Sequence, residues 1–156
     1  MNKNIGFVRK LIKGKIAEVI FEQMMREEGR YTIIPFGYEH TMPTLAQYRS
    51  LVKVQTIIDN IADAPDFVLI SHDKTEVYLV EVKYQSKLNI EDLKGYAKKL
   101  IERWEYPWLF VATPSGFKCG LCKKVLEEGA IGDLSENLVS YKSQAEYLKV
   151  LLEFER

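Results

Sequence analysis

A strand–turn–strand pattern in the middle of the chain constrains its fold more than any other feature. Residues 67–70 and 77–80 are apolar, and the polar residues 71–76 between them are typical of a turn. Together they predict an antiparallel hairpin. Pairing about the middle of that turn places Asp66, just before the first strand, directly opposite Glu81 in the second.

A lysine joins these two acidic residues on one face of the predicted hairpin. Pro65 has no backbone N–H to give to a neighbouring strand, so Asp66 is expected at the very start of the first strand. Side chains alternate between the two faces of a strand, so Glu81 and Lys83 point to the same side. Opposed carboxylates have Cβ atoms roughly 4.5–5.5 Å apart, and they repel each other unless a cation or a proton intervenes. Two hard oxygen ligands beside an ammonium group indicate a site for a divalent metal, a polarised water and an anionic substrate, which suits phosphodiester hydrolysis.

A third acidic residue, Glu18, interrupts the apolar face of a long helical stretch. Its neighbours on the same stripe are Leu11, Phe21 and Met25. A carboxylate among them is costly unless it is paired or bound to a metal. The alternative is that Glu18 lies at the boundary of this face and pairs with Lys15 or Lys83.

The remaining pattern predicts helices and strands arranged around the hairpin. Helices are expected over residues 5–28, 43–62, 90–104 and 121–128, and from a capping box of Ser143 and Glu146 through Phe154; strands are expected over 31–34 and 108–112 beside the hairpin 66–84. The helix 90–104 would connect two parallel strands. These elements favour an α/β fold in which helices flank a mixed central sheet.

Composition favours an ordinary globular protein. At 156 residues and 18.1 kDa, with 47% hydrophobic and 28% charged residues, the chain is expected to form one domain over residues 1–156. The 22 basic residues balance the 22 acidic ones, which argues against a protein that coats nucleic acid through bulk electrostatics. The apolar runs are too short to span a membrane and no signal-peptide core is present, so a cytoplasmic protein without a membrane partner is expected.

Three short segments of the chain carry a resemblance to a known family. They are Gly14-Lys15-Ile16-Ala17-Glu18, Pro65-Asp66 and Glu81-Val82-Lys83. Together with the order of the predicted elements, they resemble the PD-(D/E)XK nuclease superfamily, the restriction-endonuclease-like fold that includes archaeal Holliday junction resolvases. The helical stretch 43–62 departs from the simplest version of that fold, and it is a candidate for substrate contacts or a dimer surface.

The resemblance implies a metal site. Asp66 and Glu81 would hold Mg²⁺ or Mn²⁺. The main-chain carbonyl of Val82 would assist them, and Glu18 would complete the ligand set.

The same resemblance implies an endonuclease that hydrolyses DNA. Lys83 would orient or deprotonate the attacking water and stabilise the charge that develops on the phosphate. Gln85, on the same strand face, would contact the water or the substrate. One such site cuts one strand, so duplex or branched DNA favours a homodimer. A junction, flap, nick, duplex site or RNA all remain open as substrates.

Two other classes of function also remain open. A member of the fold without catalysis would bind nucleic acid or assemble with other proteins. In that case Asp66 would be a turn residue, and Glu81 and Lys83 would form a structural ion pair. Cys119 and Cys122 form a C-x-x-C motif before a short helix, which is compatible with a redox protein or with zinc shared across a dimer.

Other polar and aromatic residues have less specific interpretations. His72, in the hairpin turn, is expected to face solvent. Glu39 and His40 follow the first strand and are candidates to approach the site, and Asp63 competes with Asp66 as a ligand. Four aromatic residues are expected to pack the helix 90–104 onto the sheet: Tyr96, Trp104, Tyr106 and Trp108.

Overall fold

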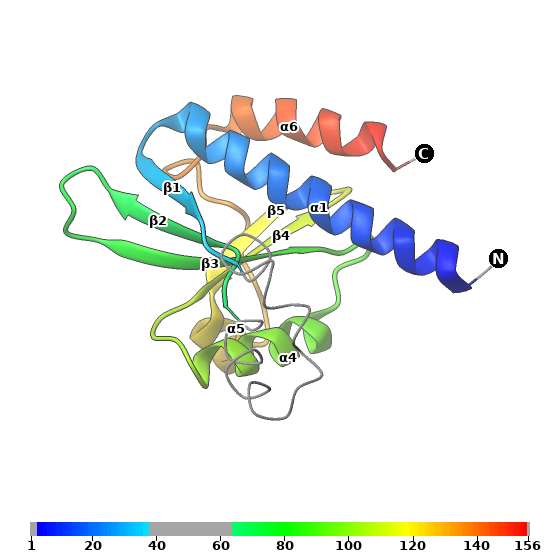
Figure 1. Ribbon diagram of the computed structural model, residues 1–156, viewed down its shortest axis with the longest axis horizontal. Helices are drawn as coiled ribbons and strands as arrows, with labels where there is room; N and C mark the ends of the chain where they lie inside the picture. Colours follow the sequence, from blue (N-terminus) through cyan, green and yellow to red (C-terminus); the bar gives the residue numbers. More distant parts are fainter. Residues whose placement is uncertain (1–2, 38–63, 156) are drawn as a thin grey trace, which may run out of the picture.

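The chain forms a five-stranded mixed sheet with helices on both faces (Figure 1). The computed structural model describes residues 3–37 and 64–155. The strands lie side by side in sequence order: β1 (Tyr31–Pro35), β2 (Phe67–Ser71), β3 (Val77–Tyr84), β4 (Trp108–Thr113) and β5 (Gly116–Leu121). The described helices are α1 (Lys3–Glu28), α4 (Ile90–Ile101), α5 (Cys122–Glu128) and α6 (Tyr141–Glu153). The predicted α/β fold with a mixed sheet is confirmed.

Strand pairing around β3 agrees with the hairpin that the sequence predicts. β3 is antiparallel to β2 and parallel to β4, to which α4 connects it. Phe67 of β2 pairs with Val80 of β3. Continuing this register by one residue places Asp66 opposite Glu81. Both the hairpin register and the parallel connection through α4 are therefore confirmed.

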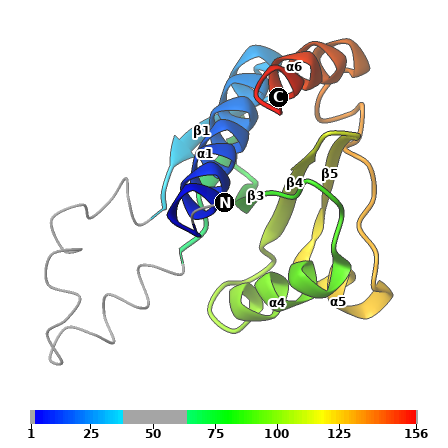
Figure 2. The ribbon, with the colours of Figure 1, turned by 90° about the vertical axis from the view of Figure 1, so that its right-hand side faces the viewer.

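Alternation of side chains along the strands builds one core on each face of the sheet. α1 and α6 cover one face, and α4 and α5 cover the other (Figures 1 and 2). The core beneath α1 contains Ala17, Phe21 and Met24 of that helix with Phe67, Val82 and Phe110 of the sheet. The core beneath α4 contains Leu93, Ala97 and Leu100 with Leu109 and Val111. The two faces of β3 are therefore in contact with different cores.

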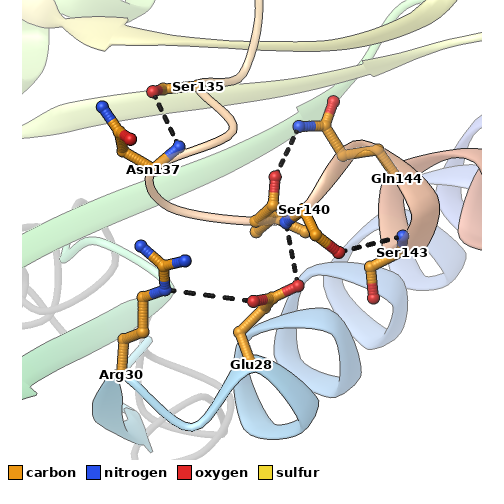
Figure 3. Close-up of polar contacts among 8 residues, drawn as sticks. Glu28, Arg30, Ser135, Asn137, Ser140, Ser143 and Gln144 are labelled. Atoms are coloured by element: carbon orange, nitrogen blue, oxygen red, sulfur yellow. Dashed lines mark hydrogen bonds and ion pairs between the residues drawn. The ribbon is translucent and has the colours of Figure 1, made fainter.

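The end of α1 is tied to the beginning of α6. Gly29 ends α1 with a φ of 67°, a left-handed conformation that glycine adopts without a steric penalty. The Glu28 carboxylate accepts a hydrogen bond of 2.9 Å from the Ser140 N–H and lies 3.9 Å from Nε of Arg30 (Figure 3). Ser140 in turn caps α6, because its Oγ accepts a 3.2 Å hydrogen bond from the Ser143 N–H (Figure 3).

Three predictions of secondary structure differ from the fold, and the first is that the helix expected over 90–104 ends at Ile101. The last helix begins at Tyr141, because Ser140 caps it, so the predicted capping box of Ser143 and Glu146 lies inside the first turns of the helix. The chain after β4 forms another strand, β5, although the sequence predicted no strand between residue 112 and the helix expected over 121–128. Two glycines lower the strand preference of this segment, but its pairing with β4 overrides that preference.

Part of the predicted helical content lies outside the described residues. The helix expected over 43–62 falls there, as do Glu39, His40 and Asp63. Within residues 3–37 and 64–155, no helix is both long and apolar enough to cross a membrane.

Candidate active site

Asp66 lies directly before β2 and is held by backbone groups of both neighbouring strand segments. Its Oδ2 accepts a 2.8 Å hydrogen bond from the Val82 N–H of β3. Its main-chain carbonyl accepts hydrogen bonds from the N–H groups of Phe36, at 2.8 Å, and Gly37, at 3.1 Å, just after β1. Asp66 therefore joins three strands at one point, which fixes the position of its carboxyl group.

Because Pro65 has no backbone N–H, it cannot donate a hydrogen bond to the Val82 carbonyl of the neighbouring strand. The N–H and C=O groups of one strand residue point to the same side of the strand, so the Val82 carbonyl faces the side on which Asp66 binds its N–H. If the register of β2 and β3 continued, Pro65 would stand opposite Val82, and proline has no N–H to donate. A carboxylate and a main-chain carbonyl therefore share this edge of β3.

Glu81 and Lys83 project from β3 toward α4. They pair with Leu109 and Val111 of β4, which belong to the core beneath that helix. Nζ of Lys83 lies 3.3 Å from Oε1 of Glu81 and 4.3 Å from the centroid of the Tyr96 ring on α4. An ammonium group is attracted to the face of an aromatic ring, and more strongly when it is desolvated. Lys83 is thus held between a carboxylate and a ring.

Asp66 and Glu81, which we call the acidic pair, lie opposite each other when the register of β2 and β3 is continued by one residue. Burial, reinforced by the negative charges of Glu81 and Glu18, raises the pKa of Asp66 to about 8. The hydrogen bond from Val82 and the charge of Lys83 oppose this rise only in part. Burial also raises the pKa of Glu81, although Lys83 stabilises its anion. Both carboxyl groups therefore resist ionisation, and Asp66, with its pKa raised to about 8, favours its protonated form at neutral pH.

Lys83 remains charged despite its partial burial. Burial lowers the pKa of its ammonium group, but the carboxyl groups of Glu81 and Asp66 outweigh this effect and leave the pKa raised. At neutral pH Lys83 is therefore a hydrogen-bond donor and a fixed positive charge, rather than a base.

Glu18 contributes charge to the site from α1. Its negative charge raises the pKa values of both Asp66 and Glu81. Its Oε2 lies 3.2 Å from Nζ of Lys15, which is one of the ion pairs expected for it. In the part of the chain that the structure describes, no three His, Cys, Asp or Glu side chains gather closely enough to form a metal site by themselves. A role for Glu18 as a metal ligand stays a prediction.

Gln85 stabilises the segment that leads from β3 into α4. Its Oε1 accepts a 2.9 Å hydrogen bond from the Asn89 N–H, and its Nε2 donates to the Asn89 carbonyl at 3.2 Å. Asn89 then caps α4 by accepting a 3.1 Å hydrogen bond from the Asp92 N–H. The amide of Gln85 is therefore used within the fold, and its predicted contact with water or substrate stays untested.

The sequence did not identify Tyr96 as part of the site. It was assigned to core packing, and it does pack against the core beneath α4, but its ring also faces the Lys83 ammonium group. Trp104 packs against the core beneath α4 as expected, but Trp108 packs against the core beneath α1, on the opposite face of the sheet, so that part of the prediction is wrong. Tyr106 packs against neither core, because it is 72% exposed. The signal for Tyr96 is its position at the edge of the apolar stripe of α4, within reach of a long side chain from the sheet.

Cys119 and Cys122 lie against opposite faces of the sheet. Cys119 packs against the core beneath α1, whereas Cys122 belongs to the core beneath α4. Burial raises the pKa of each thiol to about 12. A redox pair requires neighbouring sulfurs and a lowered thiol pKa, so this arrangement argues against the redox alternative. His72 is exposed in the hairpin turn, as expected.

No protein-family model matches the chain, and no curated protein matches it. A function is therefore inferred from the arrangement of Asp66, Glu81 and Lys83.

Proposed function

We propose that this chain is a metal-dependent endonuclease of the PD-(D/E)XK type that hydrolyses DNA phosphodiester bonds. The observation that carries the proposal is the acidic pair with the Lys83 ammonium group 3.3 Å from Glu81. The order of α1, β1, β2, β3, α4 and β4 is the order that the family resemblance implies. Because one site cuts one strand, the proposal includes a homodimer on duplex or branched DNA.

The acidic pair fits a divalent metal. Asp66 and Glu81 supply the hard oxygen ligands that Mg²⁺ and Mn²⁺ prefer, and the Val82 carbonyl faces the same edge. In the metal-free chain, the repulsion between the two carboxylates is relieved by the proton on Asp66. Asp66 would release this proton when it binds a metal. A bound Mg²⁺ or Mn²⁺ would polarise the phosphate and lower the pKa of a coordinated water.

Lys83 supplies the positive charge that the reaction needs. Glu81 and Tyr96 restrict its ammonium group from two sides, so little rearrangement is needed when the substrate arrives. Because Lys83 is protonated, it would orient the attacking water and stabilise the additional negative charge on the phosphate. Proton removal from the water would then fall to a carboxylate of the acidic pair or to solvent.

Cleavage of labelled duplex, single-stranded, flap and four-way-junction DNA tests the proposal. Wild-type protein should cut at least one substrate with Mg²⁺ or Mn²⁺ and none with EDTA. Asp66→Asn and Lys83→Ala should each lower the rate about a hundredfold or more. Asp73→Asn and Lys98→Ala are matched controls, because both residues are exposed, with Asp73 in the hairpin turn and Lys98 on α4.

A non-catalytic nucleic-acid-binding or assembly module is the second candidate. It is favoured by the ion pair of Glu18 with Lys15, since Glu18 then binds a lysine of its own helix, and among the described residues no third acidic side chain joins Asp66 and Glu81 in a metal site. If no DNA is cut and calorimetry detects no binding of Mg²⁺ or Mn²⁺, the acidic pair is structural. Metal-independent binding of DNA by the same protein would then support the second candidate.

A further inference from the structure

A cavity of about 130 Å³ lies between α1 and the sheet, on the face opposite the Lys83 side chain. Each of the five strands contributes a side chain to its wall: Tyr31, Leu69, Tyr78, Trp108 and Cys119. Phe21 and Met25 of α1 cover one side, and Leu138, from the segment that precedes α6, closes another. We call this cavity the aromatic pocket.

The side chains that line the aromatic pocket favour an uncharged ligand. Among the residues that the structure describes, no charged side chain lines the aromatic pocket. The aromatic pocket is partly open to solvent, and an enclosed apolar cavity of comparable volume, roughly 150 Å³, binds benzene. A molecule of about that size therefore fits the volume, whereas an ion would lose its hydration without finding a partner of opposite charge.

The wall also favours a ring over an alkyl chain. Tyr31 and Tyr78 meet edge to face, with centroids 5.8 Å apart and planes at 82°. Tyr78 and Trp108 do the same at 6.1 Å and 88°. Aromatic rings prefer edge-to-face and offset contacts, so a further ring extends an array that already exists across three strands.

We propose that the aromatic pocket is a binding site for a small neutral aromatic molecule of about the size of one benzene ring. The site is separate from the acidic pair and independent of the nuclease proposal. The aromatic pocket is lined by α1 and by residues of the central strands. A ring that binds there therefore contacts both, and it stabilises the packing of α1 on the sheet. The melting temperature rises with the ratio of ligand concentration to dissociation constant, since the ligand binds the folded state.

Benzene is the probe for a titration followed by protein NMR. We expect saturable shifts at the backbone amides of Leu69, Tyr78 and Cys119, and intermolecular NOEs from benzene to the side chains of Trp108 and Leu138. Cyclohexane, a guest of similar size without a π-system, should bind more weakly. The absence of saturable shifts and of these NOEs at the solubility limit of benzene would overturn the proposal, without any variant being needed.

Leu138→Phe fills the aromatic pocket and should weaken benzene binding at least tenfold. The matched control is Leu126→Phe, the same change in a hollow between α4 and α5 on the other face of the sheet; it should leave the affinity unchanged. Equal affinity in folded Leu138→Phe protein would overturn the assignment to this cavity. If that variant does not fold, the pattern of NOEs in the wild-type protein decides.

Discussion

Replacing Asp66 by asparagine is expected to stabilise the metal-free protein at alkaline pH. Asparagine keeps an oxygen that can accept the Val82 N–H, but it removes the acid that burial disfavours as an anion. The pKa of Asp66 rises from its ordinary value of 3.8 to about 8 in the folded chain. A group whose folded-state pKa is raised stabilises the fold fully below its unfolded pKa, and this contribution disappears as the pH rises through the folded value. The wild-type protein should therefore lose stability between about pH 4 and pH 8.

The magnitude follows from this change in pKa. A difference of roughly four pH units corresponds to at most about 6 kcal/mol, at about 1.4 kcal/mol for each unit. The acidic pair titrates as a unit, and the effective dielectric constant around such groups exceeds that of a dry interior. We therefore expect Asp66→Asn to exceed the wild type by about 1–3 kcal/mol in free energy of unfolding at pH 8, and by much less at pH 4.

Urea unfolding followed by circular dichroism, from pH 4 to pH 9 in EDTA, measures this difference. Asp73→Asn is the control, because Asp73 is exposed in the hairpin turn and hydrogen bonds from Ser71 and Thr75 lower its pKa to about 2, so its charge does not change over this pH range. Parallel loss of stability with pH in wild type and Asp66→Asn would refute the reasoning. Adding Mg²⁺ at pH 8 should stabilise the wild type and leave Asp66→Asn unchanged, which tests the metal site without measuring activity.

Three further experiments test the packing of the fold. Glu155→Ala removes the acceptor of the Tyr84 hydroxyl hydrogen bond and should lower the free energy of unfolding by about 1–2 kcal/mol in urea; unchanged stability would contradict the contact. Asn89→Ala removes the cap of α4 and should cost about 1 kcal/mol by the same assay, whereas Asn89→Asp keeps the acceptor and should cost much less. With thiol pKa values of about 12, Cys119 and Cys122 should react with iodoacetamide at pH 8 far more slowly in the folded protein than in urea. Fast alkylation of the folded protein would show that the thiols are not protected.

Several elements were predictable because their signals are local. The hairpin register followed from two apolar stretches and the turn between them, and the structure pairs Phe67 with Val80 accordingly. Asn89 caps the start of α4, and Gly129, with a φ of 63°, ends α5; both are residue types that commonly mark helix ends. The placement of Glu81 and Lys83 on one face follows from the two-residue period of a strand.

Other features depend on contacts between distant parts of the chain. β5 contains two glycines and becomes a strand because β4 supplies its hydrogen bonds. Ser140 rather than Ser143 caps α6, since Glu28 at the end of α1 binds the Ser140 N–H. β4 as the partner of β5, and Glu28 as the partner of Ser140, cannot be recognised from the residues next to them in the sequence.

The sequence by itself determined which residues meet on the hairpin, because backbone periodicity and turn length set the register. Only the tertiary structure decided the state of those residues. The protonation of Asp66 depends on how completely the surrounding layers exclude water, and the confinement of Lys83 depends on Tyr96, which α4 brings from elsewhere in the chain. Likewise, Cys119 and Cys122 look like a pair in sequence, but the sheet separates them because one lies within β5 and the other begins α5. Burial and distance are properties of the packed molecule, and local preferences along the chain do not encode them.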